Sequence, residues 1–316
     1  MSNLLPDRDI ANCPSESAKP PTLESTPART ESLGQLTIRR SLPIARRRTV
    51  GPWCFFDRYG PLTFSEGKPM DVAPHPHIGL QTVSWLTEGE VLHRDSLGCE
   101  QLVRAGELNL MTSGRGIAHS EETPARSSGR LSGVQLWIAL PEQARGSAPR
   151  FDHYAELPQV DLRGGVVRVI AGEMDGVSSP ARVHSPLLGA EIRIAAGEQL
   201  TLPLEPDFEH ALVFLEGEAT VDRVILGPDA LHFLGCGRSE LSIAAKSAST
   251  AILIGGLPLG EPIVMWWNFV ARSHEEIAAA REAWGQGERF GEVTGYRGPR
   301  LAAPSLRFKA KPNPAS

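Results

Sequence analysis

The sequence predicts an all-β protein made of two barrels or sandwiches. Short apolar runs follow one another closely along most of the 316 residues, and 31 Gly and 26 Pro divide them. Gly and Pro supply the turns that many short strands need, and this texture is typical of a β-sandwich or β-barrel. Since a domain takes roughly 150 residues, the length fits two domains.

The expected strands form two similar groups, followed by one helix. The first group covers 79–86, 90–94, 101–104, 107–111 and 134–140, and the second covers 166–170, 191–195, 199–204, 211–215, 219–226 and 251–254. Near the end, Ser273 and Glu276 form a capping-box pattern that begins a short C-terminal helix. Ile277 and Trp284 share one face of this helix, so we expect it to pack on a sheet.

The two ends of the chain differ in composition from the rest. Residues 1–34 are rich in Ser, Thr, Pro, Glu and Ala, and they have too few large apolar groups to offset chain entropy. We therefore expect a disordered tail over 1–34, domains over 35–150 and 151–305, and a Pro- and Lys-rich tail over 306–316.

Bulk charge and cysteine usage limit the location and the partners. The net charge of −5 gives no general attraction to nucleic acid or to an anionic membrane surface, and no stretch is long and apolar enough to span a membrane. The four cysteines are scattered without a CxxC pair, which favours a reducing compartment. The first residues lack the pattern of a signal peptide, so the cytoplasm is the expected location.

Two short motifs carry the chemistry. His75-Pro76-His77 and His119-Ser120-Glu121 offer three imidazoles and one carboxylate, each pair spaced i, i+2. Side chains at this spacing leave the same face of a strand, so two adjacent strands would aim all four at one point. Such a set suits a first-row transition metal, and iron, manganese, copper, nickel and zinc all remain open. Four protein ligands would leave about two positions of an octahedron free for O2 or substrate.

The second half repeats the first without these ligands. Residues 83–90 resemble residues 211–218, at an offset of 128. At that offset Pro203 and Glu205 stand where the first half has His75 and His77, and no His-x-Glu follows. We therefore expect one divalent metal per chain, in the first half.

These motifs resemble those of a known family. Residues 75–83 with 88–90 resemble the first cupin motif, and residues 106–119 resemble the second. Within the cupins, 75–77 with 111–121 are similar to the pirin signature, and the similarity continues through 133–138 and 260–269. The resemblance implies a bicupin: a metal-binding N-terminal cupin barrel over 35–150 and a C-terminal cupin barrel over 151–305 without metal ligands.

The resemblance also implies roles for individual residues. It assigns His75, His77, His119 and Glu121 as ligands of iron, Fe(II), in the N-terminal barrel. Cupins usually take a carboxylate ligand from the position of Gln81, whose amide is a poor ligand, so Glu121 is favoured.

Two further residues are candidates beside the ligands. Gln81 shares the parity of 75 and 77, and we expect it to face inward as a hydrogen-bonding neighbour of the ligands. His93 lies in a strand expected in the same barrel. It is either a pocket residue that contacts substrate or carries a proton, or a satisfied barrel residue.

Three functions from different classes follow. The first is a pirin-like dioxygenase, resembling quercetin 2,3-dioxygenases, that opens a flavonol-like aromatic substrate with O2 and releases carbon monoxide; Glu121 would be the catalytic base. The second is an iron-dependent, redox-responsive regulator that acts through a protein partner, since no DNA-binding motif is present. The third is a cupin that binds metal with little turnover.

Overall fold

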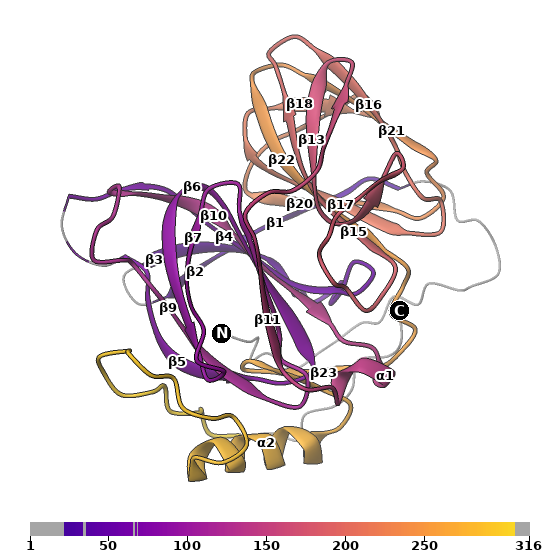
Figure 1. The fold of residues 1–316 in the computed structure, drawn as a ribbon. Helices are drawn as coiled ribbons and strands as arrows, with labels where there is room; N and C mark the ends of the chain where they lie inside the picture. The colour runs from indigo at the N-terminus through magenta and orange to yellow at the C-terminus, as the bar shows by residue number, and fades with distance from the viewer. Residues whose placement is uncertain (1–21, 34–35, 66, 68, 307–316) are drawn as a thin grey trace.

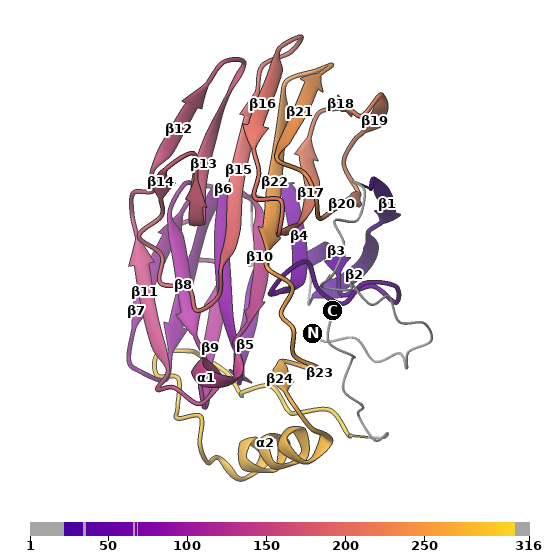
Figure 2. The same cartoon turned by 90° about the vertical axis from the view of Figure 1, so that its right-hand side faces the viewer.

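The computed structural model describes residues 22–33, 36–65, 67 and 69–306, which form two β-barrels packed against each other (Figure 1). Strands dominate and the longer helix stands near the C-terminus, so the predicted all-β bicupin architecture is confirmed. Figure 2 shows the two barrels from the side, with that helix at the end of the N-terminal barrel farther from the C-terminal barrel.

The N-terminal barrel is a ten-stranded sheet. Its main order is β11-β8-β6-β10-β4-β3-β2, with β5, β7 and β9 paired off this path. The strands are β2 (Arg29–Leu33), β3 (Leu36–Leu42), β4 (Trp53–Thr63), β5 (Asp71–His77), β6 (Leu80–Asp95), β7 (Glu100–Arg104), β8 (Leu108–Thr112), β9 (Ile117–Glu122), β10 (Arg130–Ala139) and β11 (Arg150–Tyr154). The short helix α1 (Glu142–Arg145) follows β10.

The C-terminal barrel combines an eight-stranded and a four-stranded sheet. The larger sheet has the order β1-β20-β17-β22-β15-β13-β12, with β14 paired to β13, and the smaller has the order β16-β21-β18-β19. The strands are β1 (Glu24–Pro27), β12 (Gln159–Leu162), β13 (Gly165–Met174), β14 (Val177–Ser178), β15 (Leu187–Ile194), β16 (Gln199–Pro203), β17 (Glu209–Glu216), β18 (Ala219–Val221), β19 (Val224–Leu226), β20 (Ala230–Gly235), β21 (Glu240–Ala245) and β22 (Ser249–Gly256).

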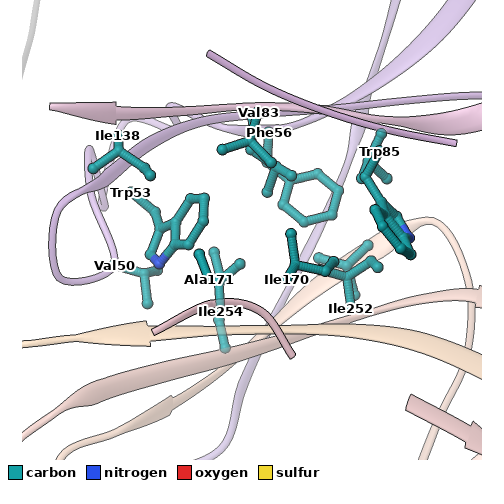
Figure 3. Close-up of a cluster of buried hydrophobic side chains, with 14 of the residues drawn as sticks. Val50, Trp53, Phe56, Val83, Trp85, Ile138, Ile170, Ala171, Ile252 and Ile254 are labelled. Carbon is teal, nitrogen blue, oxygen red and sulfur yellow. The ribbon is translucent and has the colours of Figure 1, made fainter. Parts of the chain in front are cut away.

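An apolar core joins the barrels. Figure 3 shows side chains from the two barrels meeting between their sheets: Val50, Trp53, Phe56, Val83, Trp85 and Ile138 from one side, and Ile170, Ala171, Ile252 and Ile254 from the other. The Trp53 indole also donates to the carbonyl oxygens of Leu188 at 3.1 Å and Gly255 at 3.0 Å. Because β17 and β22 of the C-terminal barrel are buried on both faces, residues 211–215 and 251–254 are continuous apolar runs rather than alternating ones.

The expectation of a disordered tail over 1–34 is wrong for the part that the structure describes. Residues 24–27 form β1, which pairs with β20 of the C-terminal barrel, and 29–33 form β2, which pairs with β3 of the N-terminal barrel. Both are edge strands, so backbone hydrogen bonds hold them and large apolar side chains are not required. Residues 1–21 and 34 lie outside the described part.

The domain boundaries expected at 150 and 305 do not follow the packing. Strand β11, at 150–154, pairs with β8 of the N-terminal barrel. At the other end the hairpin of β23 (Val264–Trp266) and β24 (Phe269–Ala271) returns to that barrel, where Val270 N–H donates to the Ile78 carbonyl at 3.0 Å. The segment after β22 therefore closes the N-terminal barrel.

The expected helix is confirmed as α2 (His274–Gln286). Ser273 caps it by accepting a hydrogen bond from Glu276 N–H, and Gly287 ends it in the left-handed conformation. Ile277 and Trp284 are buried in a cluster that includes Ile78 and Phe269. No helix in the described part of the chain is long and apolar enough to cross a membrane.

Candidate metal centre

The two sequence motifs lie on paired strands. β5 carries His75 and His77, β9 carries His119 and Glu121, and the strands run antiparallel with His75 directly opposite His119. A β-bulge interrupts this pairing between Val72 and His75. The i, i+2 spacing thus brings three imidazoles to one point inside the N-terminal barrel.

The three histidines form a compact group. One ring nitrogen from each of His75, His77 and His119 lies within 4.8 Å of the others, and all three residues are buried. The Nε2 atoms of His77 and His119 are only 3.0 Å apart. Among the described residues, no other group of three or more metal-ligating side chains has donor atoms that converge in this way.

Each ring is held through its other nitrogen. Nδ1 of His75 lies 2.9 Å from the Ala73 carbonyl oxygen, and Nδ1 of His77 lies 3.1 Å from the Asn268 carbonyl oxygen. A carbonyl oxygen only accepts, so both rings donate from Nδ1 and present the lone pair of Nε2. Such outer hydrogen bonds fix the orientation and tautomer of metal-binding histidines.

Burial keeps these rings neutral at pH 7. It lowers the pKa of His75 to about 4, and burial together with the neighbouring His75 holds the pKa of His77 well below its ordinary value. The pKa of His119 is also well below its ordinary value, because of burial first and then of His75. Neutral imidazoles with inward lone pairs are the form that binds metal, so the donor set fits a transition metal.

Glu121 shares the cavity but not the converging group. Its Oε1 accepts a hydrogen bond from the Ser84 hydroxyl at 3.3 Å, and burial raises the pKa of its carboxyl group. It lines the same cavity as the three histidines. Its expected role as fourth ligand and base stays a prediction, whereas the three histidines lie where the sequence placed them.

Gln81 does not face the metal centre. Its amide nitrogen donates to Thr112 Oγ1 and to the carbonyl oxygen of Arg182 in the C-terminal barrel, each at 2.9 Å. Gln81 shares its strand face with Val83, which packs between the barrels, while Ser84 on the opposite face reaches Glu121. The expectation that Gln81 faces the metal centre is wrong. β5 ends at His77, and after the turn before β6 the odd-numbered side chains lie on the other face of the sheet.

His93 lies behind His119 and does not line the cavity. The Nδ1 atoms of the two rings are 3.3 Å apart, and the His93 ring stacks on Phe151 of β11 at a centroid distance of 4.3 Å. Asp95, on the same strand, accepts from His93 Nε2 at 3.2 Å. The sequence left two alternatives open for His93, a pocket residue or a satisfied barrel residue. In the structure His93 contacts the predicted ligand His119 and does not line the cavity.

The cavity beside the histidines has a volume of about 60 Å³. Phe55 and Trp137, which stack at a centroid distance of 4.0 Å, form part of its wall, and Asp57, Tyr59 and Gln135 add polar groups. Asn268, from the turn between β23 and β24, lines it as well and supports His77. Sequence reasoning gave Asn268 no role, since no local motif links it to a residue 191 positions earlier.

The fold and this centre define a bicupin with a three-histidine site in its N-terminal barrel. Residues 35–138 match the sequence model of pirin, and residues 189–291 match that of the pirin C-terminal cupin domain. The chain belongs to the pirin family.

Relatives of known name support the same placement. A Pseudomonas aeruginosa protein with the provisional name quercetin 2,3-dioxygenase is 44% identical over 277 residues, which are 87% of this chain and 88% of that protein. A pirin-like protein of Caulobacter vibrioides is 39% identical over 82% of this chain and 92% of its own length. The crystal structure of quercetin 2,3-dioxygenase from Acinetobacter baumannii superposes with a TM-score of 0.88 at 42% identity, covering 91% of this chain and 97% of that one.

Proposed function

We propose that this protein is a metal-dependent oxidoreductase that opens quercetin-type flavonols with O2 and releases carbon monoxide. The observation that carries the proposal is the convergence of three neutral imidazoles on a largely apolar cavity that the Glu121 carboxyl group also lines. The names of the relatives agree with this reaction.

The protein supplies the ligands and the walls of the site. His75, His77 and His119, together with Glu121, would hold one divalent metal per chain, which we assign as Fe(II). When bound, the metal would supply Lewis acidity toward the 3-hydroxyl and 4-carbonyl of a flavonol and open positions for reaction with O2. The stacked rings of Phe55 and Trp137 offer an apolar wall against which a flat aromatic substrate can pack.

In this proposal Glu121 takes the 3-hydroxyl proton. Burial raises the pKa of its carboxyl group, and a higher pKa makes a carboxylate a stronger base near neutral pH. The Ser84 hydroxyl, which donates to Oε1, holds the carboxylate in place.

The test is aerobic incubation of iron-loaded protein with quercetin, following loss of flavonol absorbance and release of carbon monoxide. Luteolin, which is quercetin without the 3-hydroxyl, is the matched control substrate and should not react. His77→Ala should bind less metal and lose turnover, and elemental analysis should give one metal per wild-type chain. Absence of carbon monoxide with fully iron-loaded protein would refute the dioxygenase. Two tightly bound metals per chain would refute the single centre.

The alternative function is a redox-responsive regulator, and the same assay distinguishes it from a dioxygenase. A chain that binds one metal tightly, leaves quercetin unchanged and alters a protein contact when the metal is oxidised would be a redox-responsive regulator.

A further inference from the structure

Three buried side chains form a line that leads away from the metal centre. His119 Nδ1 lies 3.3 Å from His93 Nδ1, and His93 Nε2 lies 3.2 Å from Asp95 Oδ2. The exposed fractions of His119, His93 and Asp95 are 1%, 4% and 1%, so water does not replace these contacts. The line connects β9 to β6, two strands that pair with each other here.

His119 differs from the other two histidines in what faces its Nδ1. His75 and His77 each meet a carbonyl oxygen, which can only accept and so fixes the proton on Nδ1. His119 meets another imidazole, whose nitrogen can be a donor or an acceptor. The tautomer of His119 therefore depends on the tautomer of His93.

Asp95 determines which tautomer His93 adopts. A carboxylate oxygen only accepts, so His93 donates from Nε2 to Asp95 Oδ2, which in the neutral ring leaves a lone pair on Nδ1. That lone pair accepts a hydrogen bond from His119 Nδ1–H, and His119 then presents the lone pair of Nε2 toward His77. Asp95 is itself held, because its Oδ1 accepts from Leu97 N–H at 2.8 Å and from Cys99 N–H at 3.1 Å.

We propose that Asp95, acting through His93, is the positioning residue that makes His119 a metal ligand. This inference rests on the metal centre proposed above. Asp95 stabilises the one neutral arrangement of protons in which His119 Nε2 is free to bind, as a carbonyl oxygen does directly for the other two histidines.

Asp95→Asn is the informative variant, since the structure determines how the new amide is oriented. The N–H groups of Leu97 and Cys99 both need an acceptor, so they hold the amide oxygen at the position of Oδ1. The NH2 group then faces His93 Nε2 and donates to it. His93 must carry its proton on Nδ1, and His119 must carry its proton on Nε2, where the metal would bind.

The experiment uses zinc as a diamagnetic probe. Competition with a chelator should show that Asp95→Asn weakens zinc affinity by about 10- to 100-fold, the range for groups that support metal ligands. Asp222→Asn, which removes a carboxylate bonded to Arg238 in the C-terminal barrel, is the matched control and should bind zinc as the wild type does. Nitrogen-15 NMR of the zinc-loaded wild type should show His93 protonated on Nε2 and unprotonated on Nδ1, a signature that a merely structural Asp95 would not require.

The outcomes separate the two proposals. If the wild type takes up no zinc at this site, the proposed metal centre is refuted, and the proposed role of Asp95 is refuted with it. If the wild type binds zinc and Asp95→Asn binds it equally well, only the role of Asp95 is overturned. Should Asp95→Asn not fold, the wild-type spectrum still decides, because a His93 ring protonated on Nδ1 in the zinc-loaded protein contradicts the proposal.

Discussion

His210 in the C-terminal barrel is a buried histidine without a ligand role, and replacing it by leucine should stabilise the protein. It lies on β17 with an exposed fraction of 0%, and neither ring nitrogen makes a well-formed hydrogen bond in the described part of the chain, although the Phe208 backbone lies close enough to affect the ring. Burial lowers the pKa of His210 to about 4, against a smaller opposing effect of the Phe208 backbone. An unpaired buried polar group costs about 1–3 kcal/mol. His210→Leu removes this cost, although the new side chain must fit against Gly255, which the ring contacts.

The gain should grow as the pH falls. The pKa of His210 is lower in the folded protein than in the unfolded chain, so the unfolded state binds more protons between about pH 4 and 6.5, and stability rises with pH over that window. At about 1.4 kcal/mol per pKa unit, the loss approaches about 3 kcal/mol below pH 4 and is already about 2 kcal/mol at pH 5 relative to pH 8. The wild type carries this loss and His210→Leu does not.

Urea unfolding of metal-free wild type and His210→Leu at pH 8 and pH 5 measures the effect. The other histidines titrate equally in both proteins, so the difference between their unfolding free energies isolates His210. We expect the variant to be more stable at both pH values, with an advantage about 2 kcal/mol larger at pH 5. An advantage that does not change with pH would show that His210 is not buried as a neutral ring, and the reasoning would fail. Zinc uptake should be the same in both proteins.

Three further substitutions test the assignment of side chains to faces of the sheets. Glu121→Gln should lower flavonol turnover per bound metal by a factor on the order of a hundred or more, and unchanged turnover per metal would refute its role as base. Gln81→Ala should leave metal content nearly unchanged and lower the melting temperature, because its amide bonds the other barrel; loss of metal would contradict that orientation. Trp85→Phe should cost about 1–3 kcal/mol in urea unfolding, since the indole donates to buried Glu191 at 2.8 Å, and a neutral effect would argue against that bond.

The sequence predicted the histidine group because the information is local. A His-x-His motif in a strand places both rings on one face whatever the rest of the chain does, and the second motif needs only a neighbouring strand. Gln81 could not be placed this way, since the parity argument holds within one strand and Gly79, with φ of 68°, separates β5 from β6. The hydrogen-bond partners of the histidine Nδ1 atoms could not be predicted from the sequence either, because only the fold brings Asn268 to His77.

The N-terminal segment illustrates a different limit. Composition predicted disorder for residues that form β1 and β2, because burial of apolar side chains is only one way to stabilise a strand. β1 pairs along one edge of the C-terminal barrel, and Ser25 Oγ lies 2.8 Å from His232 Nδ1. Edge pairing is a tertiary property, and polar sequences satisfy it whenever a neighbouring strand offers unpaired backbone groups.

The two barrels share a strand arrangement but use its interior differently. β5 pairs with β9 in the N-terminal barrel, with His75 opposite His119, and β16 pairs with β21 in the C-terminal barrel, with Leu202 opposite Leu241. Both leucines belong to the buried core of their barrel. The sequence offset of 128 pointed to Pro203 as the counterpart of His75, one residue away from the side chain that faces inward. Apolar packing makes the C-terminal barrel stable without any ligand, whereas neutral imidazoles packed together in the N-terminal barrel lack that gain, and a bound metal would offset the difference.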